Sequence, residues 1–154
     1  MKILSKRKFS FNVFIASLML MLSSVAFADY VPYPGKKQVK LVSIEAANIL
    51  VVNFETWPGY GKTLKIKLPD LVLPGSSAKP SLCELKLAKK ALKFTKSYLK
   101  SLKKVTVEDM RMETSADNNA ISPIYTSKGS LAQGLIKKGL ARSSSTKSNK
   151  PWCK

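Results

Sequence analysis

The lysines of this sequence are the residues whose type and spacing most clearly suit them to binding negatively charged groups. Along residues 86–103 they recur at steps of three and four: Lys86, Lys89, Lys90, Lys93, Lys96, Lys100 and Lys103. Residues at these steps share one face of a helix. Such a row can contact successive phosphates of an anionic polymer, with an affinity that depends strongly on salt. A solvated helix face has the same pattern, so the row defines a candidate surface rather than a function.

The composition points to the same kind of partner. The chain has 154 residues, 27 lysines and arginines, nine acids and no histidine, and its net charge is +18. So large a positive charge predicts an anionic partner: nucleic acid, a phosphate-rich surface polymer or an acidic protein. Charge alone does not choose among the three.

The first 28 residues are typical of a signal peptide. A basic start (Lys2, Lys6, Arg7 and Lys8) precedes the apolar run VFIASLMLML, and Ala-Phe-Ala at 26–28 matches a cleavage pattern. We predict cleavage between Ala28 and Asp29 and export to the periplasm or the medium. An uncleaved anchor is the weaker alternative because the run is shorter than the ~20 apolar residues of a membrane span. Removing four leader cations leaves 23 against all nine acids, and a net charge of +14 on 126 residues.

Both cysteines, Cys83 and Cys153, fall in the predicted mature chain. An even number of cysteines in an exported protein predicts one disulfide. It would close a loop of about 70 residues, for which the chain-entropy estimate is roughly 4 kcal/mol. Two free thiols or a metal pair are the alternatives, and the lack of histidines and further cysteines disfavours the metal pair.

The remaining pattern predicts an α+β domain built on a small barrel. Alternation and β-branched residues favour strands at 39–46, 48–56, 63–73, 103–112 and 121–127. Ser81 and Glu84 have the spacing of a capping box, which predicts a helix that reaches Leu102. Its apolar residues recur at steps of three and four and predict one stripe that packs on a core: Ala88, Ala91, Leu92, Thr95, Leu99 and Leu102. A second helix is expected over 130–141, with Ser130 as its candidate cap. We divide the chain into a leader at 1–28, an extended lead-in at 29–38, a domain at 39–142 and a polar tail at 143–154 tied back by the disulfide.

Three segments, in this order, resemble the exported bacterial form of the staphylococcal nuclease (thermonuclease) family. They are CELKLAKKALKFTKSYLKSLKKVTVEDMRM, LAQGLIKKGLAR and KPWC, and the turn WPGYGK adds to the likeness. The similarity covers about residues 39–153. It implies a five-stranded OB-fold β-barrel with two to three helices. It also implies a nuclease ancestry, because family members cleave phosphodiesters with bound calcium.

The resemblance places unsuitable residues at the family's catalytic positions. Asn48 stands at the first metal-binding aspartate, Lys67 at the first catalytic arginine and Val72 at the second aspartate. Leu73 stands at the ligand threonine and Gly75 at the general-base glutamate. The second arginine falls at Asp117, Asn118 or Asn119. Valine, leucine and glycine side chains cannot bind calcium, and lysine lacks the planar fork of arginine. We therefore expect no catalytic residues, no metal and no cofactor.

Three hypotheses follow for the function. The first is an inactive thermonuclease-like protein that binds nucleic acid or another anionic polymer through the lysine face, with Trp57 and Tyr60 as stacking aromatics. The second is an active metal-dependent nuclease with a rearranged site, for which Asp70 and Glu45 are the fallback ligands. Asp70 is two residues before Val72, and on one continuous strand the two would share a face. The third is an envelope protein-interaction module.

Overall fold

The computed structural model describes residues 33–112, 118–146 and 150–153. The chain divides into two units, Met1–Tyr30 and Val31–Lys154, and the first lies wholly outside the described residues. The leader and the cleavage site between Ala28 and Asp29 therefore stay predictions. Within the described ranges, no helix has both the length and the apolar character needed to cross a membrane.

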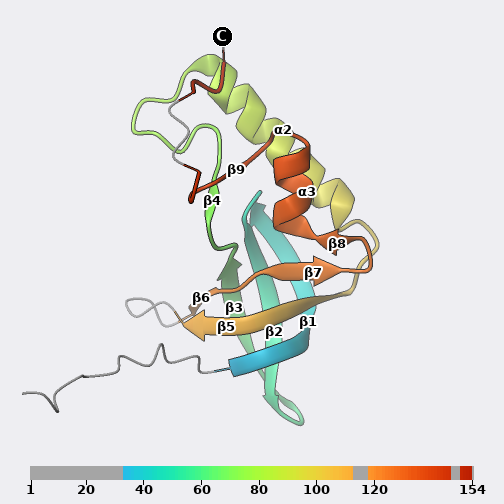
Figure 1. Cartoon of the computed structure of the whole chain (residues 1–154). Coiled ribbons are helices and arrows are strands. Elements are labelled where there is room, and N and C mark those ends of the chain that lie inside the picture. Colours follow the sequence, from blue (N-terminus) through green and yellow to red (C-terminus); the bar gives the residue numbers. More distant parts are fainter. Residues whose placement is uncertain (1–32, 113–117, 147–149, 154) are drawn as a thin grey trace, which may run out of the picture. The chain divides into compact units, whose positions relative to one another are not determined.

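Five strands close into a mixed β-barrel (Figure 1). In spatial order they are β1 (Tyr33–Ala46), β2 (Ile49–Trp57), β3 (Tyr60–Lys67), β6 (Asn119–Ile121) and β5 (Lys104–Met112). The pairing of β1 with β5 closes the circle, and β3 and β6 are the parallel pair. This order is compatible with an OB-fold. The predicted class, α+β with a five-stranded barrel and two helices, is confirmed.

Strand β1 starts earlier than the sequence pattern indicates. We expected a strand at 39–46 after an extended lead-in, but residues 33–38 already pair with β5, from Tyr33 opposite Met110 to Gln38 opposite Thr106. A register shift lies between Tyr33 and Lys36, where the N–H of Gly35 donates to Asp109 Oδ1 at 2.7 Å. The strand extends because β5 offers a partner, and a partner 70 residues away leaves no local signal.

Two helices cover one end of the barrel: α2 (Leu82–Tyr98) and α3 (Leu131–Lys137). The predicted capping box at Ser81 and Glu84 is present, with both reciprocal hydrogen bonds. Helix α2 is shorter than expected because the chain leaves the helical region at Ser101, whose φ is +69°.

Helix α3 has the predicted cap, since the Ser130 side chain accepts from the N–H of Gln133. Its last turn closes at Lys138, and Gly139 follows with a φ of +66°. The helix therefore ends before Ala141, the predicted boundary.

The predicted strand 63–73 is wrong as a single element. Strand β3 ends at Lys67, a turn follows, and only β4 (Leu71–Val72) resumes extended pairing, with β9 (Arg142–Ser143). Asp70 sits in that turn with a φ of +54°, so strand alternation does not relate it to Val72. Its main-chain oxygen instead accepts the N–H of Ser144 at 3.0 Å.

Proline also interrupts the predicted strand at 121–127. Strand β6 stops at Ile121, before Ser122 and Pro123, and β7 (Ile124–Thr126) then pairs with β5 and with β8 (Gly129–Ser130). The break follows from the missing N–H of proline, which cannot donate to a ladder. The side chain of Ser122 stabilises the break by donating to the Glu108 carbonyl at 2.9 Å.

The core joins the barrel to α2. Its largest fully buried side chains are Leu50, Leu64, Ile66, Leu68, Met110, Ile124, Leu131 and Leu135. From α2, Ala91 and Leu99 enter this core, as the predicted apolar stripe requires. Thr95 is also fully buried, and its Oγ1 donates to the Ala47 carbonyl at 2.9 Å. This bond fixes α2 over the turn between β1 and β2.

We predict that Thr95→Val lowers the free energy of unfolding by about 1–3 kcal/mol, because the buried Ala47 carbonyl loses a donor. Urea denaturation followed by circular dichroism measures the change. Thr63→Val, at an exposed position of β3, is the matched control and should change stability little. Equal stability losses in the two variants would contradict this account of the helix–barrel contact.

Candidate functional site

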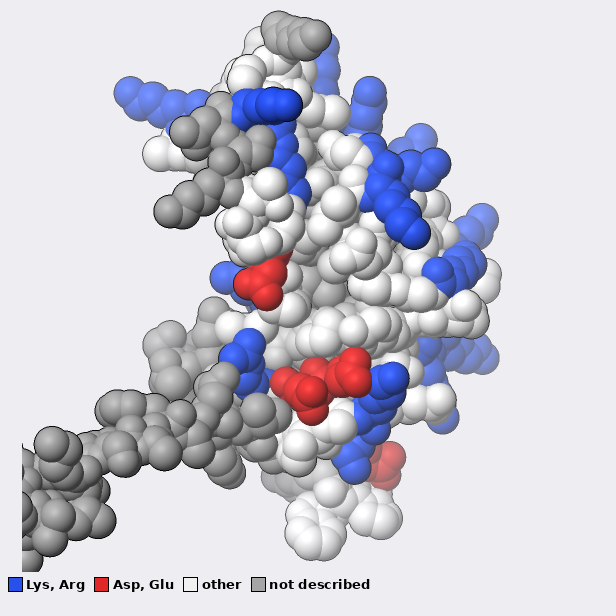
Figure 2. Space-filling model, in the orientation of Figure 1, with Lys and Arg blue, Asp and Glu red and all other residues white. Residues whose placement is uncertain are grey.

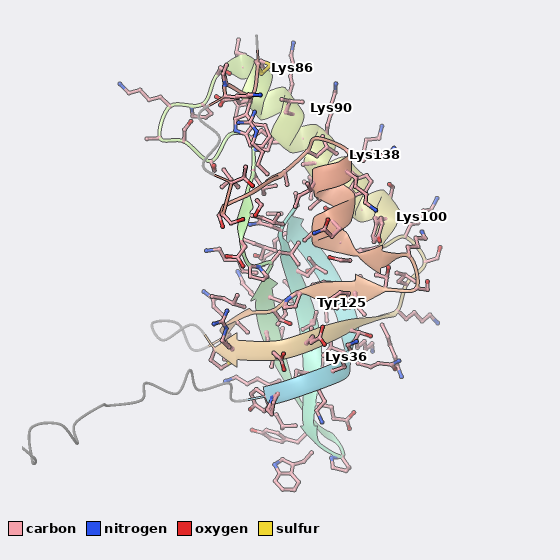
Figure 3. All side chains as sticks on the ribbon, viewed as in Figure 1. Lys36, Lys86, Lys90, Lys100, Tyr125 and Lys138 are labelled. Atoms are coloured by element: carbon pink, nitrogen blue, oxygen red, sulfur yellow. A yellow bond between two sulfur atoms is a disulfide. The ribbon has the colours of Figure 1, made fainter. Side chains whose placement is uncertain are left out.

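The structure places the six predicted binding lysines on one exposed face formed by α2 and the turn that follows it: Lys86, Lys89, Lys90, Lys93, Lys96 and, after the helix, Lys100. The buried residues Ala91 and Thr95 lie on the opposite side of the helix. The labelled lysines of α2 all point away from the barrel (Figure 3). The ion pairs of the described residues, Lys36 with Glu108 and Lys65 with Glu45, involve none of the six.

Three further lysines flank this face from the neighbouring segment: Lys128, Lys137 and Lys138. Helix α3 can lie close to α2 because Gly134 has no side chain. A Cβ there would be 3.3 Å from the rings of Phe94 and Tyr98. Lys128 Nζ donates to the Tyr98 carbonyl at 3.3 Å and lies 5.7 Å from the centroid of its ring. We call the nine lysines together the basic surface.

Sequence reasoning missed these three lysines because they lie far from α2 along the chain. One signal could have found them. No acid occurs from residue 85 to 107 or from 118 to 154, so both helices after the Glu84 cap are free of negative charge. Figure 2 shows basic side chains along the side of the molecule formed by the helices, where no acidic side chain is visible, and a mixture of acidic and basic side chains lower on this face.

Trp57 and Tyr60 are not part of the basic surface. They face each other across the turn of the β2–β3 hairpin, which projects from the barrel at the end away from α2 (Figure 1). Trp57 is 74% exposed and Tyr60 is 69% exposed. The sequence grouped these aromatics with the lysines as one binding site, and the fold separates them.

Three of the positions implied by the family resemblance lie close together, two on neighbouring strands and Asn48 in the turn before β2. The Asn48 carbonyl accepts the N–H of Leu68, and Lys67 pairs with Ile49. Asn119 lies opposite Lys65 in the parallel pair of β3 and β6. The fold thus brings Asn48, Lys67 and Asn119 to one region. Asp117 lies outside the described residues.

The other implied positions follow the turn after β3. Val72 pairs with Arg142 in the β4–β9 ladder, and Leu73 packs against the core. Gly75 has a φ of +78° and lies against α2, where a Cβ would meet that of Ala88 at 3.6 Å. None of these three side chains offers an oxygen or nitrogen atom.

Both fallback metal ligands have structural partners. Glu45 Oε2 is 3.0 Å from Lys65 Nζ, and Asp70 Oδ1 accepts from Ser144 Oγ at 3.4 Å. Within the described ranges, no three histidine, cysteine, aspartate or glutamate side chains come together as a possible metal site.

The predicted disulfide between Cys83 and Cys153 is present, with a Cα–Cα distance of 6.3 Å. It ties the end of the chain to the first turn of α2. Arg142 holds the same segment, because its guanidinium donates to the carbonyls of Lys150 and Pro151 and stacks 3.9 Å from the Trp152 ring centroid. This arginine therefore serves the fold of the tail.

A shallow cavity of about 210 Å³ lies between the start of β5 and β7. Its lining includes Lys104 and the hydroxyl groups of Thr106, Tyr125 and Thr126. Burial raises the pKa of the Tyr125 phenol, and a hydrogen bond with Glu108 and the charges of Glu108 and Asp109 raise it further. The Tyr125 phenol therefore stays neutral at physiological pH.

Comparison with protein-family models and with curated proteins gives no match for this chain.

We predict that Tyr125 ionises above its ordinary pKa of 10.0. Because the folded-state pKa is the higher one, this group's contribution to stability is fully present below about pH 10 and is lost as pH rises through the folded pKa. A spectrophotometric phenolate titration should show a late step that is absent in Tyr125→Phe. Glu108→Gln should move the step to lower pH, and an unmoved step would contradict the assigned cause.

Proposed function

We propose that this chain is an exported thermonuclease-like protein that does not cleave nucleic acid but binds it through the basic surface. One observation carries the proposal: nine exposed lysines lie on α2 and the turn after it, on the β7–β8 turn and at the end of α3, and these segments contain no acid after Glu84. The OB-compatible barrel supports the family assignment, and it does not by itself fix the activity.

The energetics favour a partner with regularly spaced negative charge. Lysines three and four residues apart repel each other along α2, at a cost of about 0.2–0.5 kcal/mol per pair. A phosphate polymer relieves this repulsion and releases its own counterions. In water these side chains are fully solvated, so binding buries little apolar area and depends mainly on charge.

The basic surface suits phosphates rather than bases. Lysine is a compact point charge on a flexible stem, and the face carries no arginine fork. The exposed aromatic pair lies at the other end of the barrel, away from the basic surface. We therefore expect affinity that is nearly independent of sequence.

The lack of cleavage rests on the implied catalytic positions. Lys67 would have to replace an arginine that grips the phosphoryl oxygens bidentately. Gly75 cannot activate water, and Val72 cannot hold a metal. Arg142 is engaged with the tail carbonyls and with Trp152.

We predict that Lys86→Gln combined with Lys90→Gln weakens binding of a labelled oligonucleotide severalfold. The plot of log affinity against log salt should become less steep by about 1.5, since each lost phosphate contact removes roughly 0.7–0.9 from the slope. Fluorescence anisotropy at several salt concentrations measures both quantities.

The matched control is Lys37→Gln combined with Lys40→Gln, which removes the same charge from exposed positions of β1. It should change affinity much less than the pair on α2. Equal losses in the two double variants would show that net charge, rather than the basic surface, determines binding.

We also predict no cleavage of single- or double-stranded substrates with calcium, magnesium or manganese, under conditions in which a staphylococcal nuclease digests them fully. Metal-dependent cleavage that Asp70→Ala abolishes would overturn the proposal and establish the rearranged site. Cleavage that survives in both Asp70→Ala and Glu45→Gln would be assigned to a contaminating nuclease if it disappears when the protein is repurified.

A further inference from the structure

The β2–β3 hairpin has a tip that the proposed function does not use. Trp57 and Tyr60 are both more than two-thirds exposed, although aromatic side chains usually contribute large buried areas. The two residues between them, Pro58 and Gly59, suffice for the turn, and Gly59 supplies its φ of +81°. The exposed rings are therefore not needed to make the turn.

Two hydrogen bonds within the hairpin satisfy polar groups of the tip. The N–H of Gly59 donates to Glu55 Oε1 at 2.8 Å, and Thr56 Oγ1 donates to the Tyr60 carbonyl at 3.1 Å. Pro58 has no N–H to satisfy. Because an unpaired backbone group in a nonaqueous medium costs several kcal/mol, these bonds lower the cost of moving the backbone of the tip out of water. The charged Glu55 carboxylate limits the tip to shallow insertion at the depth of the headgroups.

The chemistry of the tip matches the interface of a lipid bilayer. Tryptophan and tyrosine combine an apolar ring with one polar group and concentrate at the depth of the lipid headgroups. The net positive charge of the chain attracts the whole protein toward anionic lipid.

The position of the hairpin permits shallow insertion. It extends beyond the barrel at the end away from the helices, so the tip can enter an interface before the barrel meets it (Figure 1). The other large exposed apolar side chains of the described residues, Val42, Val72, Leu82 and Leu85, come from other elements. We propose that the Trp57–Tyr60 tip is a peripheral attachment site for anionic bilayers, separate from the basic surface.

The intrinsic fluorescence of Trp57, measured in a Trp152→Phe background so that the second tryptophan does not contribute, tests this proposal with the full-length protein. On vesicles of phosphatidylcholine containing a minority of phosphatidylglycerol, at physiological salt, the emission should shift to the blue and become protected from acrylamide. The Trp57→Ala and Tyr60→Ala double variant lacks the reporting ring, so its binding is measured by sedimentation with vesicles. Its vesicle partition coefficient should fall about tenfold or more, because two large side chains no longer leave water.

Two matched variants separate the tip from other surfaces. Val42→Ala removes an apolar side chain that is 57% exposed elsewhere on β1 and should leave the partition coefficient unchanged. Lys86→Gln combined with Lys90→Gln should keep the blue shift on vesicles even where it weakens oligonucleotide binding. Thermal denaturation of every variant checks that the fold is kept.

Three results would overturn the proposal. One is the absence of a blue shift on vesicles. Another is vesicle binding that is lost in the lysine variant and kept in the aromatic variant. The last is a blue shift with a single-stranded oligonucleotide and none with vesicles, which would assign the tip to base stacking.

Discussion

Closure of the barrel by β1 is the constraint on which the rest of the structure depends. Its first part pairs with β5 and its second part with β2, so a single strand joins both ends of the sheet. The turn that follows β1 presents the Ala47 carbonyl to Thr95, and this bond holds α2 against the barrel. With α2 fixed by its buried side, its lysines must face water, and α3 brings further lysines beside them through the contact at Gly134. The basic surface is thus a consequence of how the barrel is closed and capped.

The same closure places the basic surface and the aromatic tip at different ends of the barrel. Lysines without neighbouring acids lie over the helices. The acids of the described residues lie mainly on the strands, where Glu45 and Glu108 pair with lysines. The aromatic tip projects from the barrel at the far end of the β2–β3 hairpin. Under the proposed function, a phosphate polymer would bind at one end while the other end remains available to a different surface. The positions implied by the nuclease resemblance are brought partly together, with Asn48 and Lys67 next to each other where β2 and β3 pair. Their side chains supply no acid.

Sequence patterns correctly predicted the elements that depend on residues close together in the chain. The capping box at Ser81, the cap at Ser130 and the apolar stripe of α2 all rest on neighbours within four residues, and all three are present. The disulfide followed from counting cysteines.

The prediction of one strand at 63–73 was wrong because Pro69 and Asp70 turn the chain. Only two residues then pair again, with a strand about 70 residues later. The early start of β1 and the second group of lysines were missed for the same reason: each depends on a partner distant in sequence. The grouping of Trp57 with the lysines failed because no sequence pattern states at which end of a barrel a hairpin turn lies.

A salt titration of nucleic-acid binding tests the central claim most directly. The purified protein is titrated into a labelled oligonucleotide at low ionic strength, and the titration is repeated at rising salt. The account predicts binding in the micromolar range whose logarithm falls linearly and steeply with the logarithm of salt concentration. The absence of any interaction at low ionic strength, or binding that salt leaves unchanged, would contradict the assignment of the basic surface to an anionic polymer.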